Sequence, residues 1–109
     1  MSRFRILYSD SARDDISAAV EYIALILSEE GAAERLLGSL EKATSRLSDF
    51  PESSPLCLDE QLKSRGIRCS QVSNYLLFYY VNQEKKEIRI IAFLHSKRDY
   101  ANLLLTKGN

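Results

Sequence analysis

The sequence predicts an α+β domain in which an N-terminal helical hairpin packs on one face of a small, largely antiparallel sheet. Two segments with apolar residues at helical spacing lie in the first half of the chain, and three strand-like segments lie in the second half. A short alternating segment at the N-terminus adds one more strand, so the predicted order is β-α-α-β-β-β. With 109 residues, the chain is expected to form one domain over residues 1–109.

The first half of the chain predicts one strand and two helices. Apolar residues at alternate positions within residues 4–8 favour a short strand. Ser9, Asp10 and Ser11 offer N-cap side chains for a helix whose apolar stripe extends over about residues 12–29. Gly31 separates this helix from a second one over about residues 32–49. Two helices joined by so short a turn are expected to form an antiparallel hairpin.

The second half predicts a loop followed by three strands. Residues 51–64 contain both prolines and mixed polarity, which is typical of a loop. Strands are expected over residues 67–72, 75–81 and 87–95, with short polar turns between them. The middle strand is apolar at every position, so we expect it to lie centrally in the sheet with both faces covered.

Strict alternation along the last strand predicts which of its faces meets the helices. The uniformly apolar set, which should contact the hairpin, consists of Ile88, Ile90, Ala92 and Leu94. The mixed set, which should face away from it, consists of Arg89, Ile91, Phe93 and His95. In the strand predicted over residues 67–72, the same alternation places Arg68 on this open face. Large apolar side chains on an uncovered face predict a surface that binds a partner.

The net charge of zero is unevenly distributed along the chain. Residues 1–60 hold six Lys/Arg and twelve Asp/Glu, whereas residues 61–109 hold nine Lys/Arg and three Asp/Glu, so the halves carry about −6 and +6. A basic half favours an anionic partner, either a nucleic acid or an acidic protein segment. The alternative is that the helices happen to carry acids and the strands happen to carry cations.

Other classes of protein do not fit the sequence. No apolar run approaches the roughly 20 residues that span a bilayer, and the N-terminus lacks the pattern of an export signal, so we expect a cytoplasmic protein with no membrane contact. Cys57 and Cys69 match no metal-binding spacing and are expected to be reduced thiols. No metal site and no cofactor are predicted.

Five short motifs occur in a characteristic order along nearly the whole chain. They are Ser9-x-x-Ala12-x-x-Asp15-Ile16, Leu47-x-x-Phe50-Pro51, Arg65-Gly-Ile-Arg68, Asn74-Tyr75-Leu-Leu-Phe-Tyr79 and His95-Ser-Lys-Arg-Asp-Tyr100. Together they resemble the RelE/ParE superfamily, the toxins of bacterial type II toxin–antitoxin modules, which are also described as plasmid stabilisation proteins. The resemblance implies a toxin that inhibits growth until a cognate antitoxin binds it in a hetero-oligomer.

The resemblance also implies how the antitoxin would bind. In this superfamily an amphipathic helix and an extended tail of the antitoxin lie across the toxin, and the tail often pairs with the sheet. The residues predicted to contact a partner or a nucleic acid are Lys63, Arg65, Arg89, Lys97, Ile91 and Phe93.

The target divides the superfamily into two branches. RelE-like members cut messenger RNA on the ribosome without a metal, through attack of a ribose 2′-hydroxyl on the adjacent phosphate. For that reaction His95 would move a proton, Arg98 and Arg68 would stabilise the phosphorane charge, and Tyr100 would stack on a base. The Lys97-Arg98 pair resembles the pair that ends the last strand of these nucleases.

ParE-like members instead bind and poison DNA gyrase. RelE-like nucleases place a catalytic arginine just after the tyrosine of the central strand, where this chain has Leu76. This departure favours the ParE-like branch. Purely structural roles remain open for these residues under either function. His95 would be an ordinary strand-end residue, Lys97 and Arg98 would keep a sheet edge soluble, and Tyr100 would belong to a C-terminal turn that docks on the core or binds the antitoxin.

Overall fold

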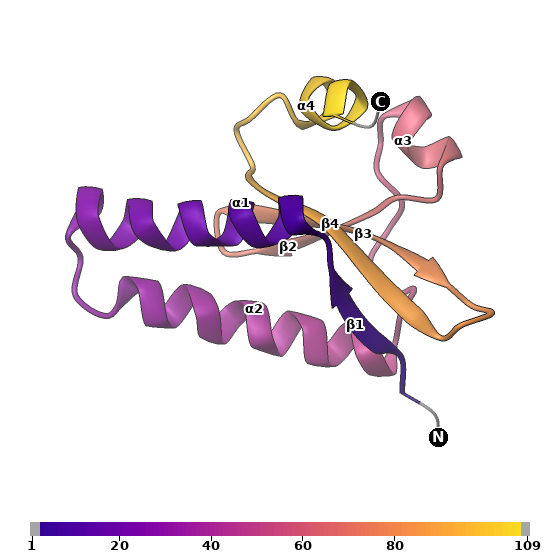
Figure 1. Cartoon of the computed structure of the whole chain (residues 1–109), viewed down its shortest axis with the longest axis horizontal. Helices are drawn as coiled ribbons and strands as arrows, with labels where there is room; N and C mark the ends of the chain where they lie inside the picture. The colour runs from indigo at the N-terminus through magenta and orange to yellow at the C-terminus, as the bar shows by residue number, and fades with distance from the viewer. Residues whose placement is uncertain (1–2, 108–109) are drawn as a thin grey trace.

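The computed structural model describes residues 3–107 and confirms the predicted α+β fold. A four-stranded sheet contains β1 (Arg5–Tyr8), β2 (Arg68–Val72), β3 (Tyr75–Asn82) and β4 (Glu87–His95), in the spatial order β1-β4-β3-β2. Its β1–β4 pair is parallel, and the β4–β3 and β3–β2 pairs are antiparallel. The central position predicted for β3 is therefore confirmed, and it shares the middle of the sheet with β4 (Figure 1).

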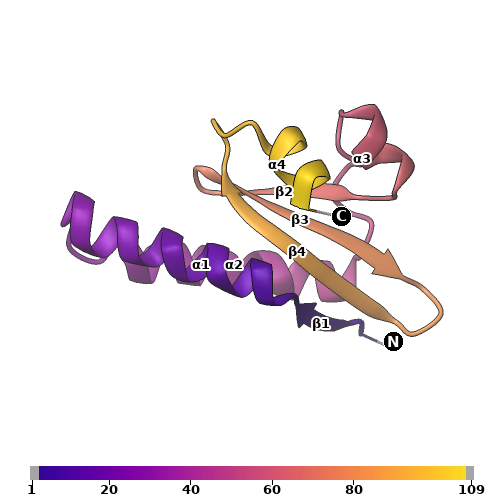
Figure 2. The same ribbon diagram turned by 45° about the horizontal axis from the view of Figure 1, so that its top comes forward.

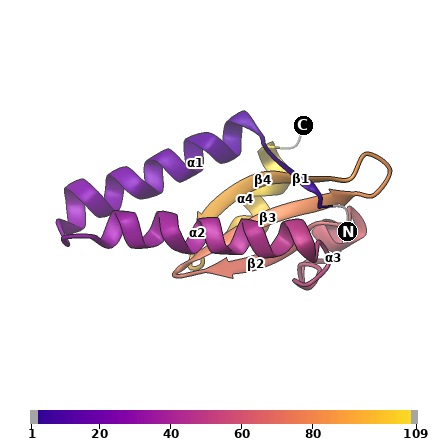
Figure 3. The ribbon, with the colours of Figure 1, turned by 90° about the horizontal axis from the view of Figure 1, so that it is seen from below.

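The predicted helical hairpin covers one face of this sheet, as Figure 3 shows. It comprises α1 (Asp10–Glu21), η1 (Tyr22–Leu27) and α2 (Ala32–Asp49). Of the three predicted candidates Ser9 caps α1, because its hydroxyl accepts a hydrogen bond from the Ala12 N–H at 3.0 Å. The expected continuation of the first helix to residue 29 was wrong, since its last turns form the wider π-helix η1, which ends at Leu27.

The opposite face of the sheet is covered too, which corrects the expectation of an open face. There α3 (Glu60–Ser64) and α4 (Tyr100–Lys107) lie over the strands (Figure 2). Asp59 caps α3 by accepting hydrogen bonds from the N–H groups of the next turn, so the segment predicted as a loop contains a short helix. The buried cluster on this face consists of Cys57, Leu62, Ile67, Phe78, Ala92 and Leu94.

A β-bulge in β4 explains why the predicted faces were partly wrong. Phe78 pairs with Ala92, but the next residue of β3, Tyr79, pairs with Ile90, so the register skips Ile91. Beyond the extra residue every side chain changes face. Ile88 and Ile90 meet the hairpin as predicted. Phe93 joins them in that core, whereas the remaining two members of the apolar set, Ala92 and Leu94, lie in the cluster on the other face.

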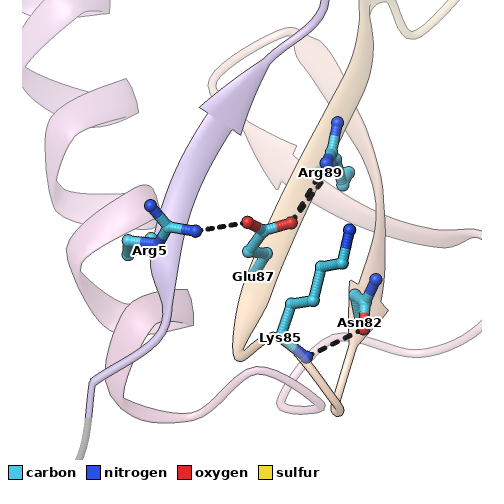
Figure 4. A network of polar contacts seen from close by, with 5 residues as sticks. All are labelled: Arg5, Asn82, Lys85, Glu87 and Arg89. Carbon is cyan, nitrogen blue, oxygen red and sulfur yellow. Dashed lines mark hydrogen bonds and ion pairs between the residues drawn. The ribbon is translucent and has the colours of Figure 1, made fainter.

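A buried carboxylate joins β1 to β4 at the end of the sheet shown in Figure 4. Glu87 is only 4% exposed, and its carboxylate accepts hydrogen bonds from both Arg5 and Arg89, the latter at 3.1 and 3.2 Å. Arg5 and Glu87 are also paired in the parallel register. In the adjacent turn, the Lys85 N–H donates to the Asn82 Oδ1 at 3.1 Å. The short edge strand β1 is thus held by an ion-pair network as well as by its backbone.

Replacing Glu87 with glutamine should lower the free energy of unfolding by about 1–2 kcal/mol. The amide keeps the shape but loses the charge that two guanidinium groups share, and its NH₂ group would face one of them. Urea denaturation measures the change, and the exposed Glu84→Gln in the neighbouring turn is the matched control, expected to stay within about 0.5 kcal/mol. Equal effects of the two substitutions would show that the network contributes nothing to stability.

Candidate functional site

His95 stands at the end of β4, where its ring edge contacts Tyr75 at a centroid distance of 5.3 Å. Its Nδ1 accepts a hydrogen bond from the Lys97 backbone N–H at 3.2 Å. With Nδ1 used as an acceptor, the proton of the neutral ring lies on Nε2, which then serves as a donor. In this arrangement His95 can donate to an anionic or carbonyl group, and it has no free ring nitrogen to act as a general base.

His95 and Arg98 line one groove between the hairpin and the end of the sheet, with a volume of about 390 Å³. This Tyr75–His95 groove is lined by Asp15, Ala18, Ala19, Tyr22, Tyr75, Phe93, Leu94, His95 and Arg98. Asp15 is held in place because its carboxylate accepts the Phe93 N–H at 3.1 Å. Burial raises the pKa of the Tyr75 hydroxyl, so this group remains a neutral donor. The groove combines aromatic walls with the carboxylate of Asp15, the half-buried His95 ring and the exposed Arg98.

Arg68 lies away from that groove. Arg68 and His95 do share a face as predicted, but it is the face that the hairpin covers. Their partners on β3, Tyr79 and Tyr75, are four residues apart, or about 13 Å along the strand. The Arg68 guanidinium donates to the Ser54 carbonyl at 2.7 Å and lies 3.9 Å from the Glu52 carboxylate. It therefore fastens the loop after α2 to the sheet.

Tyr100 lies on the opposite face of the sheet, at the start of α4. Its ring packs against Phe78 with centroids 5.1 Å apart. Burial raises the pKa of its hydroxyl. The three leucines at 103–105 pack against the same cluster, so of the two roles left open for the C-terminal segment the structure shows docking on the core. The sheet separates Tyr100 from the Tyr75–His95 groove.

The residues predicted to contact a partner are dispersed. Lys63 and Arg65 are exposed in and just after α3, and Lys97 is exposed in the turn after β4. Ile91 is half-buried against the second cluster, and Arg89 is engaged with Glu87. Phe93 is only 2% exposed and stacks on Tyr75 at 4.9 Å. The position expected for Phe93, on an uncovered face, was wrong because of the bulge.

The tip of the hairpin exposes an apolar surface that the periodicity did not predict. This apolar tip consists of Tyr22, Leu25, Ile26 and Leu27, of which Leu25 and Ile26 are 69% and 66% exposed. It projects beyond the sheet, as Figure 3 shows, and Tyr22 also lines the Tyr75–His95 groove. The signal in the sequence was the run Tyr-Ile-Ala-Leu-Ile-Leu at 22–27, which is apolar on every side rather than along one stripe.

A second groove lies between α2 and the outer edge of β2. This β2-edge groove has a volume of about 530 Å³, and its lining includes Lys42, Arg46 and Gln71. Because β2 is the last strand on its side of the sheet, its outer backbone groups form an edge. Among residues 3–107, backbone pairing of that edge occurs at its start, where the Cys69 N–H donates to the Pro55 carbonyl at 3.1 Å and Leu56 bridges to Arg68. The groove therefore sets two cations beside an open strand edge.

Among residues 3–107, no group of three or more His, Cys, Asp or Glu side chains is arranged to hold a metal ion. Within the same part of the chain, no helix is long and apolar enough to cross a membrane.

Comparison with protein families assigns the chain. The family model described as ParE toxin of type II toxin–antitoxin system, parDE, matches residues 6–100. The chain belongs to the ParE toxin family. This finding confirms the resemblance to the RelE/ParE superfamily and the reading of the chain as a type II toxin. A search of curated proteins found no match.

Solved toxin–antitoxin structures share the fold of this ParE-family toxin. In the chromosomal ParDE system from P. aeruginosa, the similar chain has a TM-score of 0.62 and 16% identity, covering 85% of this chain and 96% of that one. In the RelBE2 complex from Mycobacterium tuberculosis, the TM-score is 0.54 and the identity 19%, covering 85% of this chain and 98% of that one. The fold is thus common to a ParDE and a RelBE system.

Proposed function

We propose that this ParE-family toxin inhibits growth by binding DNA gyrase, and that a cognate antitoxin neutralises it by covering its binding surfaces. The observation that supports this reading is the dispersal of the groups expected to cleave RNA. Cleavage by a 2′-hydroxyl needs a base, an acid and a cation around one phosphate, within hydrogen-bonding reach. The β3 partners of Arg68 and His95 lie about 13 Å apart along the strand, and Tyr100 lies on the other face of the sheet.

The groups that do come together favour binding over chemistry. The His95 Nδ1 accepts the Lys97 backbone N–H, so the lone pair of this nitrogen is already engaged in a hydrogen bond and does not face a substrate. Leu76, at the position of the expected catalytic arginine, is half-buried and packs against the cluster under α4. The RelE-like alternative keeps one supporting feature, which is that His95 and Arg98 share the groove.

Two surfaces suit the two parts of an antitoxin. The apolar tip offers Leu25 and Ile26 to the apolar stripe of an amphipathic helix. The β2-edge groove offers an open strand edge beside Lys42 and Arg46, which suits an extended, acidic segment that pairs with β2. One surface is apolar and the other is basic, so together they suit an antitoxin that consists of an amphipathic helix followed by an acidic tail.

Induction of the toxin in growing bacteria should trigger the DNA-damage response, because poisoned gyrase leaves broken DNA. Primer extension on actively translated message should show no new 5′ ends at the same toxic dose. The double variant His95→Ala with Arg98→Ala is the informative comparison. New 5′ ends that disappear in the double variant, without a DNA-damage response, would replace this proposal by the RelE-like alternative.

A further inference from the structure

The face of the sheet opposite the hairpin is covered by α3 and α4 over only part of its area. The cluster under these helices contains Phe78 of β3. Closer to the β3–β4 turn, Ile88 and Ile90 point into the hairpin core, so Arg89 between them points to the other face. Its cross-strand partner on that face is Tyr80, which is 38% exposed. An arginine and a tyrosine therefore lie next to each other on an uncovered part of the sheet.

Two more cations extend this surface. Arg5 of β1 is paired with Glu87 in the parallel register and lies on the same face as Arg89. Lys85 is exposed in the turn before β4, and in Figure 4 its side chain extends along β4 in the direction of Arg89. We call this surface the basic platform, and it consists of Arg5, Tyr80, Lys85 and Arg89.

Glu87 holds the two guanidinium groups of the basic platform in position. Its side chain is 5% exposed, and the carboxylate accepts hydrogen bonds from Arg5 and, at 3.1 and 3.2 Å, from Arg89. The two arginine side chains remain 69% and 42% exposed, so both keep N–H donors for a ligand. Three cations and one buried carboxylate leave a formal charge of +2, and the charges of Glu84 and Lys86 in the adjacent turn offset each other.

A surface of this charge fits an anionic partner, which is either an acidic protein segment or a nucleic acid. An acidic segment that adds to a sheet needs an open strand edge, but β4 is paired with β1 on one side and with β3 on the other. A single strand of nucleic acid needs no such edge, because its phosphates bind cations and its bases stack on an exposed aromatic ring. Arg89 and Tyr80 supply these two kinds of contact as direct neighbours.

We propose that the basic platform binds single-stranded DNA, with its three cations on phosphates and the Tyr80 ring on a base. The choice of DNA over RNA rests on the proposed function, since gyrase acts on DNA. The platform lies on the opposite face of the sheet from the Tyr75–His95 groove and the hairpin. A protein partner on the hairpin side would therefore leave the platform open to DNA.

Fluorescence anisotropy of a labelled oligothymidine of about 15 nucleotides, titrated with the purified toxin, tests the proposal. If two to three phosphates are bound, the association constant should fall about 7- to 20-fold between about 50 and 200 mM salt. Tyr80→Ala should weaken binding about 5-fold or more without changing the salt dependence, because it removes stacking and no charge.

Lys85→Glu should weaken binding about 10-fold at the lower salt concentration and reduce the salt dependence. Arg13→Glu is the matched control, because Arg13 is exposed on α1, on the hairpin side, and the change in charge is the same. It should leave the affinity within about 2-fold. Both substitutions in the platform leave the contacts of Glu87 with Arg5 and Arg89 in place, so the folded state keeps this network.

A toxin that does not bind the strand at the lower salt concentration would overturn the proposal. Equal weakening by Arg13→Glu and Lys85→Glu would do the same, because binding would then follow overall charge. Tighter binding of an oligouridine of the same length would exclude DNA as the preferred ligand. Polyglutamate that displaces the strand, together with unchanged binding by Tyr80→Ala, would assign the platform to an acidic protein segment instead.

A gyrase supercoiling assay with the same preparation separates this proposal from the proposed function. A toxin that binds the strand but leaves supercoiling normal would keep the DNA site and contradict gyrase binding. A toxin that blocks supercoiling without binding the strand would keep gyrase binding and contradict the DNA site.

Discussion

Replacing Phe93 with alanine should lower the free energy of unfolding by about 3–5 kcal/mol. Phe93 is almost fully buried, stacks on Tyr75 at 4.9 Å and belongs to the core under the hairpin. Its removal would leave a cavity between α1 and β4, where the backbone N–H of Phe93 is also bound by Asp15. Equilibrium denaturation in urea, monitored by circular dichroism, measures the loss.

Ile91→Ala is the control that makes this a test of the β-bulge. A strictly alternating strand would place Ile91 and Phe93 on one exposed face, and both substitutions would then cost little. With the bulge, the half-buried Ile91 should cost about 1–2 kcal/mol and Phe93 clearly more. Phe93→Leu should recover about half of the loss, because it refills most of the cavity. Equal, small losses at both positions would contradict the bulge.

Placing two charges on the apolar tip, as Leu25→Glu with Ile26→Glu, should weaken antitoxin binding at least 100-fold, or by about 2.7 kcal/mol. Both side chains are largely exposed, so the isolated toxin should keep its stability within about 0.5 kcal/mol per substitution. In the complex, however, each carboxylate would be buried without a partner charge. The ligand for the measurement is the product of the small reading frame next to the toxin gene, titrated calorimetrically against both proteins.

Leu58→Glu is the matched control for the tip. Leu58 is 90% exposed and directly precedes Asp59, the N-cap of α3. Figure 1 shows α3 at the other end of the molecule from the tip of the hairpin. The same chemical change at this position should leave the affinity unchanged. Unaltered binding by the double tip variant would remove the tip from the antitoxin interface, and equal weakening by Leu58→Glu would assign the effect to charge alone.

The sequence predicted the elements whose signals are local. The hairpin followed from helical periodicity and one glycine, and α2 occupies residues 32–49 as predicted. The last strand also has its predicted limits, Glu87–His95. The bulge escaped prediction because Ile90 and Ile91 are both isoleucine, so nothing in the pattern tells which of them is the extra residue. With five residues, α3 is too short to show a helical period.

In the candidate site, too, only the residues that lie close together in the sequence were predicted correctly. His95 and Arg98 lie close in sequence, and they line one groove in the structure. The positions of Arg68 and Tyr100 depended on the strand register and on the face that α4 covers, neither of which is encoded locally. The apolar tip was missed because helical periodicity assigns only one stripe of the first helix to the core, and Leu25 and Ile26 lie outside that stripe, although the apolar run was visible in the sequence.

A gyrase supercoiling assay tests the central claim, binding rather than cleavage, most directly. Relaxed plasmid, gyrase and ATP are incubated with increasing amounts of the purified toxin, beside a translation-coupled cleavage reaction with the same preparation. The proposal predicts that supercoiling falls with toxin concentration and that the message stays intact. Normal supercoiling at saturating toxin, together with cleaved message, would contradict it.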